Sequence, residues 1–436
     1  MSKTAREQAF EILLKIEKDK AYSNLALDYV LKSETESSTD RAFVTRLVYG
    51  VTERRITLDR IYSQFLNQGM NKLKAEVLTL LRLGTFQIVF SDKIPKSAAV
   101  NETVKTANKK CKYASGMINA VLRKIESTVP DFEFESDTER LSFVYSVPKE
   151  LVNFFVYHYG IENTEGFFKE TLKEKSVFVK MNNTKTNKSA FLGLLNSECD
   201  SVKETVLDDS FEISSKVPVF ELESYKKGFF HVEDISSQLC VKALSPQENE
   251  RVLDVCGAPG GKSFTIAEHI NNKGSVVSCD IYPQRAELIE KGARRLGLFS
   301  VKPLVNDATV FNEDLGLFDR VLCDVPCSGL GIIGKKPEIK YKNLDDIKDL
   351  IPIQKKILDV SSGYVKKGGT LVYSTCSVNP NENRRVCDEF LKHHTDFSTV
   401  KVLPELTRCR NEGDYLTLMP HINKCDGFFI AKFVRN

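Results

Sequence analysis

Apolar residues recur at intervals of three and four along the first 125 residues, with polar residues between them. This spacing places the apolar side chains on one face of a helix. Short polar joints separate the runs, so the pattern predicts a series of helices that pack as an all-α bundle. The predicted helices are 5–16, 23–32, 41–65, 73–90, 98–109 and 115–125.

The pattern changes after residue 125. Residues 126–145 are acidic and lack helical periodicity at their start, which is typical of a linker that runs into the next domain. Beyond it, helical and strand-like runs are mixed up to residue 230, and we expect a small α+β segment there. Helices are predicted at 149–160 and 162–173, and strands at 176–182, 217–222 and 228–234.

Short apolar strands alternate with helical runs from Arg251 onward. The first unit has a strand at 252–255, a glycine-rich turn at 257–261 and a helix that starts near Lys262. This order is typical of the first βα unit of a doubly wound, nucleotide-binding sheet. Further strands are predicted at 275–280, just before Asp307, at 320–323, at 370–374 and at 427–435, the last as an antiparallel edge strand.

The glycine-rich turn and two acidic residues suggest a nucleoside site. Glycines let the backbone approach a ligand, and the free amides of the following helix suit a carboxylate or phosphate. Pro259 restricts the turn and removes an amide, so a phosphate-free nucleoside fits better than a dinucleotide. Asp280 lies at a strand end where an acid can meet ribose hydroxyls, and Asp307 can accept from an adenine amino group. Each could instead cap a helix.

Two cysteines are predicted at strand ends, where open α/β sheets place their ligands. Cys327 follows Asp324 and Pro326, and Cys376 follows Thr375. A helix predicted to hold Pro380 in its first turn would lower the pKa of Cys376 with its positive end. Other cysteines are expected to be small buried hydrophobes, namely Cys240, Cys256, Cys279, Cys323 and Cys387.

Composition narrows the class of protein. The 436 residues, 42% hydrophobic and 28% charged, suit several separately cored domains. No apolar run approaches the roughly 18 residues of a membrane span, no signal-peptide core is evident, and we expect a cytoplasmic protein. The eleven cysteines show no zinc-ligand spacing, so free thiols and no metal are expected.

Charge is unevenly distributed along the chain. Net charge is only +3, but residues 1–130 hold 22 Lys and Arg against 14 Asp and Glu, a balance of +8, and the other residues sum to −5. A basic leading module suits a polyanionic partner. A solvated helical surface is the plainer explanation of the same charge.

The N-terminal stretch resembles a NusB-like RNA-binding domain, most clearly in TDRAFVTRLVYGVTERRITLD and IPKSAAVNETVKTAN. The motifs VLDVCGAPGGK, DVPCSG and STCS, in this order, resemble the bacterial rRNA small-subunit methyltransferase B family, within the NOL/NOP/Sun RNA cytosine-5 methyltransferases. The resemblance spans nearly the whole chain. It implies a NusB-like bundle at 1–130, a linker and small α+β connector at 131–230, and an α/β Rossmann-like methyltransferase domain at 231–436.

The resemblance also implies a reaction, a cofactor and site residues. With S-adenosylmethionine as methyl donor and no metal, the protein would methylate carbon 5 of a cytosine in small-subunit (16S) rRNA. It would be a monomer and would bind neither a membrane nor DNA. Cys376 would be the nucleophile, Cys327 would assist product release, and Asp324 would orient the base or act as an acid. The implied S-adenosylmethionine pocket consists of Cys256, Gly257, Ala258, Pro259, Gly260, Gly261, Lys262, Asp280, Asp307 and Asp324.

Three residues depart from the family pattern. Gly257 stands where alanine is usual, which would loosen the turn slightly, and Lys180 and Glu233 replace the usual arginine and glutamine. Two thiols suit cytosine chemistry: a thiolate that adds to carbon 6 makes carbon 5 nucleophilic, and a second group near the ring assists the final elimination.

Other functions remain as alternatives. DNA cytosine-5 methyltransferases use the cysteine of the PC motif, here Cys327, as nucleophile. The chain could also be an RNA-binding assembly or antitermination factor with a vestigial methyltransferase fold, or its helical part a packing module. A dehydrogenase is disfavoured by Pro259 and by the absence of a histidine suited to hydride transfer.

Overall fold

The computed structural model describes residues 3–19, 38–173, 176–406 and 410–436. The chain forms two compact units: unit 1 comprises residues 1–173 and 333–342, and unit 2 comprises 174–332 and 343–436. This division into two units does not test the predicted segment boundaries near 130 and 230, which stay predictions.

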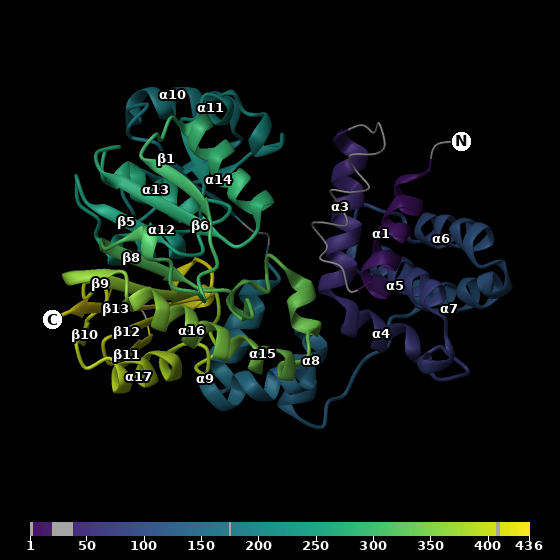
Figure 1. Cartoon of the computed structure of the whole chain (residues 1–436). Coiled ribbons are helices and arrows are strands. Elements are labelled where there is room, and N and C mark those ends of the chain that lie inside the picture. The colour runs from purple at the N-terminus through teal and green to yellow at the C-terminus, as the bar shows by residue number, and fades with distance from the viewer. Residues whose placement is uncertain (1–2, 20–37, 174–175, 407–409) are drawn as a thin grey trace. The chain divides into compact units, whose positions relative to one another are not determined.

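Unit 1 is helical, as predicted. Its α-helices are α1 (Ala5–Asp19), α3 (Ser38–Glu53), α4 (Arg55–Ser63), α5 (Ala75–Phe90), α6 (Lys96–Lys110), α7 (Ser115–Ser127), α8 (Asp137–Tyr145) and α9 (Lys149–Thr171), with short 3₁₀ turns at Met70–Lys72, Lys112–Ala114 and Pro337–Tyr341 (Figure 1). α5 is apolar on most of its surface and contacts α1, α3, α4, α6 and α7. A helix that is hydrophobic all round is buried, so α5 forms the centre of the bundle.

Several helix boundaries differ from the prediction. The run predicted as one helix over 41–65 is two helices, with Arg54 between them. The predicted linker becomes helical at Asp137, where the Ser136 hydroxyl caps α8 by accepting a hydrogen bond from the Glu139 amide. α9 joins the two helices predicted at 149–160 and 162–173 across a kink at Gly160. The helix predicted at 23–32 lies outside the described residues.

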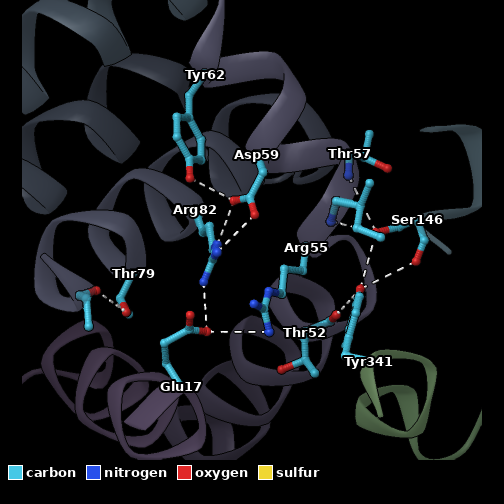
Figure 2. A network of polar contacts seen from close by, with 12 residues as sticks. Glu17, Thr52, Arg55, Thr57, Asp59, Tyr62, Thr79, Arg82, Ser146 and Tyr341 are labelled. Atoms are coloured by element: carbon cyan, nitrogen blue, oxygen red, sulfur yellow. Dashed lines mark hydrogen bonds and ion pairs between the residues drawn. The ribbon is translucent and has the colours of Figure 1, made fainter. Parts of the chain in front are cut away.

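Residues 333–342 interrupt unit 2 in sequence but pack in unit 1. The Lys340 ammonium donates to the Glu53 carbonyl at 2.8 Å, and the Tyr341 hydroxyl donates to the Thr52 carbonyl at 2.9 Å. Figure 2 shows that the Tyr341 hydroxyl also faces Ser146, 3.3 Å from its side-chain oxygen. Burial raises the pKa of Tyr341, so this phenol stays a neutral donor.

Unit 2 begins with a small antiparallel sheet in the order β2-β3-β1-β4. Its elements are β1 (Val177–Met181), α10 (Lys188–Glu198), β2 (Ser201–Glu204), β3 (Ser210–Ser214), a 3₁₀ turn (Val219–Glu221), α11 (Glu223–Lys226) and β4 (Phe230–Val232). The predicted strand over 217–222 is wrong: Pro218 precedes the 3₁₀ turn, and Val217 and Phe220 are exposed rather than packed.

The larger sheet has nine strands among the described residues. They are β5 (Arg251–Asp254), β6 (Ser275–Asp280), β7 (Val301–Val305), β8 (Phe318–Asp324), β9 (Val365–Thr375), β10 (Phe397–Val400), β11 (Arg410–Glu412), β12 (Tyr415–Leu418) and β13 (Phe428–Arg435). β7, β6, β5, β8 and β9 are parallel neighbours in that order, and β13 pairs with β9 in antiparallel fashion. The predicted antiparallel last strand is confirmed, but its edge position is wrong, because β12 and β10 pair with its other side.

Helices cover both faces of this sheet (Figure 1). They are α12 (Ile235–Leu244), α13 (Gly261–His269), α14 (Pro283–Leu296), α15 (Leu344–Lys348), α16 (Leu350–Ser362), α17 (Arg384–His393) and α18 (Pro420–Asn423). Val252 and Val372 pack on one face, with α12, α13 and α14, while Leu253 and Leu371 pack on the other, with α16 and α17. The sheet is therefore doubly wound, and the carboxyl ends of its parallel strands share one edge.

Candidate active site

The two predicted thiols meet at the carboxyl edge of the sheet. β8 and β9 are parallel neighbours, with Asp324 opposite Ser374, and each continues into a loop that carries a cysteine. The Sγ atoms of Cys327 and Cys376 lie 3.0 Å apart, and both side chains are half-buried. A substrate atom could therefore reach either sulfur.

The surroundings of Cys327 raise the pKa of its thiol. Contact with the Cys376 sulfur, burial, and the nearby Glu382 and Asp324 carboxylates raise the pKa of Cys327. Cys327 therefore holds its proton more firmly than a free cysteine does.

Asp324 lies between the thiols and the glycine-rich turn. Its carboxylate accepts hydrogen bonds from the Lys262 ammonium at 2.7 Å and from the Ser374 hydroxyl at 2.7 Å. Burial alone would lower the pKa of Lys262, but the Asp324 carboxylate raises it above its ordinary value. The pair is therefore an ammonium and a carboxylate that form a short ion pair.

The glycine-rich turn has the predicted position and brings buried polar groups together. α13 starts at Gly261, Gly260 adopts φ +119°, and the Gly257 amide donates to the Cys279 carbonyl at 2.7 Å. Beneath the turn, the Ser263 hydroxyl is 2.6 Å from an oxygen of Asp254 and 2.7 Å from the Ser278 hydroxyl.

Gly257 does more than loosen this turn. A Cβ at this position would lie 2.2 Å from the Ser278 Oγ and 2.9 Å from an Asp254 oxygen, which is closer than real Cβ atoms come. The expectation that the glycine is a mild variant is therefore incomplete: in this chain the missing methyl group makes room for Ser278.

Asp280 and Asp307 each accept a hydrogen bond from the residue two positions later, and neither is a helix cap, because Tyr282 is the N-cap of α14 and Asn312 that of the next 3₁₀ turn. Asp280 is buried, accepts from the Tyr282 amide at 3.0 Å and lies 3.4 Å from the Arg285 guanidinium. Asp307 is exposed and accepts from the amide and hydroxyl of Thr309. These contacts leave further lone pairs available, so their predicted binding roles stay predictions, as do those of Cys256, Ala258 and Pro259.

The remaining cysteines that were expected to be packing residues are free thiols. Burial raises the pKa of Cys240, Cys279 and Cys323 to about 12, and the pKa values of Cys256 and Cys387 are also raised by burial. Such thiols stay protonated and unreactive at neutral pH. Within the described ranges no three His, Cys, Asp or Glu side chains gather to hold a metal ion.

One sequence argument for Cys376 is wrong in its geometry. α17 begins at Arg384, with Asn383 as its N-cap, so Pro380 and Glu382 lie in the turn before the helix. The positive end of α17 is thus displaced from the cysteine. Sequence reasoning also missed Glu382 as a site residue, although its buried carboxylate contacts the loops of both thiols.

Lys180 and Glu233, which depart from the family pattern, are internal. The Lys180 ammonium donates to the Asp208 carbonyl, and Glu233 accepts from the Thr265 hydroxyl of α13. Both side chains are buried, so Lys180 acts on the packing of the small sheet and Glu233 on that of α13. Across the described parts of the chain, no helix combines the length and apolarity that crossing a membrane requires.

Comparisons with known proteins agree with this architecture. A family model described as 16S rRNA methyltransferase RsmB/F matches residues 241–434, and the NusB family model matches residues 3–127. A probable ribosomal RNA small subunit methyltransferase B of Bacillus subtilis is 38% identical, with 99% of each chain covered. The Synechocystis protein with the same description is 32% identical, with 98% of each chain covered.

Solved structures share the fold. The crystal structure of PH0851 has a TM-score of 0.84 at 24% identity and covers 99% of each chain. The structure described as NSun6 from Pyrococcus horikoshii with SFG has a TM-score of 0.59 at 20% identity, covering 66% of this chain and 98% of that one. At these identities the likeness concerns the fold alone.

Proposed function

Because this chain belongs to the ribosomal RNA small subunit methyltransferase B family, we propose that it methylates carbon 5 of a cytosine in small-subunit (16S) rRNA, with S-adenosylmethionine as methyl donor. The observation that carries the proposal is the pair of thiols, whose sulfurs lie 3.0 Å apart beside Asp324. A covalent route to carbon 5 needs a nucleophile at carbon 6 and a second group for the later proton.

The residues around the glycine-rich turn fit S-adenosylmethionine. Gly260 adopts a positive φ that residues with a side chain rarely adopt, so the turn carries no side chain at this position. Among the described side chains, none caps the first amides of α13. Those amides suit the carboxylate of the methionine moiety, and Asp280 suits ribose hydroxyls. When bound, S-adenosylmethionine supplies an electrophilic methyl group. The fit also argues against a vestigial fold.

We assign the chemistry to three side chains. The Cys376 thiolate adds to carbon 6 of the cytosine, and the electron pair moves through the ring so that carbon 5 becomes nucleophilic. Asp324, paired with Lys262, holds the base near N3 and its amino group, where a shared proton stabilises the added electrons. After methyl transfer the carbon 5 proton passes to water, the electrons of that C–H bond re-form the double bond between carbons 5 and 6, and Cys376 leaves as a thiolate. Cys327 assists this release by donating a hydrogen bond to the departing sulfur.

The N-terminal helical segment supplies the RNA contacts in this proposal. Its balance of +8 over residues 1–130 suits a phosphate backbone. Carbon 6 is inaccessible within a base stack, so the target cytosine has to be unstacked before a thiol can reach it.

Nucleoside analysis tests the proposal. Purified protein, radiolabelled S-adenosylmethionine and small-subunit rRNA from a deletion strain should give labelled 5-methylcytidine, and bisulfite sequencing should show one cytosine that loses its methyl group in the deletion strain. Label in any other nucleoside, or an unchanged cytosine-5 map, would remove this assignment.

A further inference from the structure

Glu382 is a fully buried carboxylate at the active site. It has no exposed surface and lies in the turn between the Cys376 loop and α17. Its side chain accepts four hydrogen bonds: from the Ser328 amide at 2.7 Å, the Ser328 hydroxyl at 2.5 Å, the Ser377 hydroxyl at 2.7 Å and the Gln354 amide group at 3.0 Å. All four donors are neutral, so these bonds alone compensate for its burial.

These donors belong to both thiol loops. Ser328 directly follows Cys327, and Ser377 directly follows Cys376, and their two hydroxyl oxygens also lie 2.9 Å apart. One carboxylate therefore fixes the residue after each thiol. A buried group with several geometric partners resists displacement, because moving either loop removes at least one of the donors that compensate for the burial of the carboxylate.

Neighbouring elements hold Glu382 itself in place. Gln354 of α16 also donates to the Pro326 carbonyl at 3.0 Å, so α16 fixes the Cys327 loop from its other side. The Tyr373 hydroxyl of β9 donates to the Glu382 carbonyl at 2.6 Å, and the Glu382 amide donates to Asn379. The carboxylate is thus anchored to the sheet and to α16.

We propose that Glu382 is the positioning residue that sets the spacing of the two thiols, by fixing the serine that follows each of them. The proposal deepens the proposed function and rests on it for the chemistry, although the spacing can be tested without methyl transfer. Glu382 contacts neither sulfur, and its negative charge contributes to the raised pKa of Cys327. It therefore acts on the geometry of both loops and, through its charge, on the Cys327 thiol.

A disulfide cross-link measures the spacing directly. Diamide takes two electrons and two protons from a thiol pair and is reduced to the hydrazine, leaving a disulfide that peptide mapping by mass spectrometry identifies. Glu382→Ala should slow formation of the Cys327–Cys376 disulfide by about tenfold or more, and lower kcat by about 100-fold with KM for RNA unchanged, since a displacement near 1 Å has effects of this size. Glu382→Gln, which keeps the shape, should retain most of the cross-linking.

Charge gives a second readout. Glu382→Gln removes the carboxylate, so the pKa of Cys327 should fall and its alkylation by iodoacetamide should begin at lower pH than in the unmodified protein. The matched control is Glu250→Gln, which breaks the Glu250–Arg320 ion pair at the amino ends of β5 and β8, away from the thiols. It should lower the melting temperature and leave both thiol readouts unchanged.

The outcomes separate this proposal from the proposed function. A Glu382→Ala protein as stable as Glu250→Gln, with an unchanged disulfide rate, would overturn the positioning role. If Glu382→Ala does not fold, Ser377→Ala, which removes the hydroxyl that joins the Cys376 loop to Glu382, takes its place, and an unchanged disulfide rate in that variant would overturn the positioning role instead. Slower cross-linking in a protein whose unmodified form methylates no cytosine would support the positioning role and contradict only the proposed reaction.

Discussion

The Lys262 ammonium and the Asp324 carboxylate lie 2.7 Å apart and join the two halves of the active site. Lys262 lies in the first turn of α13, after the glycine-rich turn, and Asp324 is the last residue of β8, before Cys327. A single ion pair thus connects the proposed methyl-donor side with the proposed base side. A substitution of either residue should therefore affect both the methyl-donor side and the base side of the site.

Replacement of Asp324 by asparagine tests that connection. Asp324→Asn removes the charge that keeps a proton near the base and should lower kcat by about 100- to 1,000-fold, in the range of general acid–base effects. Single-turnover methylation measures it. Asp319→Asn, at the other end of β8 and paired with Lys366 at 2.7 Å, is the matched control and should retain activity. If both variants lost activity equally, the loss in Asp324→Asn would reflect the stability of β8 and not a role at the base.

Gly257 provides a test of the turn. Gly257→Ala should weaken S-adenosylmethionine binding and lower the melting temperature, because its Cβ would lie 2.2 Å from the Ser278 Oγ. Ser278→Ala removes that oxygen, so the double variant should recover part of both losses. Calorimetric titration with S-adenosylmethionine measures the coupling. Strictly additive losses would show that the crowding lies elsewhere.

His231 should give unit 2 a pH-dependent stability. Burial alone would lower the pKa of His231, but Glu268 and Glu233 beside it raise it to about 9. Because the pKa of His231 is higher in the folded protein than the value of about 6.5 in the unfolded chain, its protonation stabilises the fold. This stabilisation is fully present below pH 6.5 and is lost as the pH rises through 9.

Urea unfolding at pH 6 and pH 9 measures this contribution. The unmodified protein should lose on the order of 1–3 kcal/mol more between these pH values than a double variant, His231→Gln with Glu268→Gln, which removes both members of the pair. His393→Gln replaces an exposed histidine and should behave like the unmodified protein. A double variant with the same pH slope as the unmodified protein would contradict the assignment to His231.

Arg82 should be central to the stability of unit 1. Its buried guanidinium donates to both oxygens of Asp59, at 2.6 and 2.9 Å, and to Glu17 at 2.9 Å, as Figure 2 shows. Arg82→Met removes the guanidinium from both carboxylates, leaving Asp59 with only the Tyr62 hydroxyl and Glu17 with Arg55 at 3.5 Å, and should cost about 3–5 kcal/mol in urea unfolding. Arg123→Met breaks the exposed pair with Glu126 and should cost under about 1 kcal/mol. Similar costs for the two would contradict a buried network.

Local patterns predicted most of the larger sheet. The runs before the glycine-rich turn, Asp280, Asp324 and Cys376 are short, apolar and bounded by polar or glycine residues, and each is a strand. The run at 217–222 is also short and apolar, but Pro218 precedes a 3₁₀ turn, and only part of the run packs, with Leu222 buried and Val217 and Phe220 exposed. Periodicity also continues through Arg54, which hid the break between α3 and α4.

The sequence predicts the site residues that lie at strand ends, but not the contacts between them. Cys327, Cys376 and Asp324 were expected there, but the 3.0 Å spacing of the sulfurs depends on how β8 and β9 pair. Glu382 bonds to Ser328, 54 residues earlier, and Lys262 bonds to Asp324, 62 residues later. Contacts over such separations leave no periodic or spacing signal in a single sequence.

The roles of the two thiols decide the central claim. Incubation with small-subunit rRNA and S-adenosylmethionine, followed by denaturing gel electrophoresis, separates free protein from protein covalently bound to RNA. Cys376→Ala should abolish both methylation and the adduct, because the attacking sulfur is gone. Cys327→Ala should accumulate the adduct, because release is blocked. An adduct that persists in Cys376→Ala and disappears in Cys327→Ala would contradict the account by exchanging the two roles.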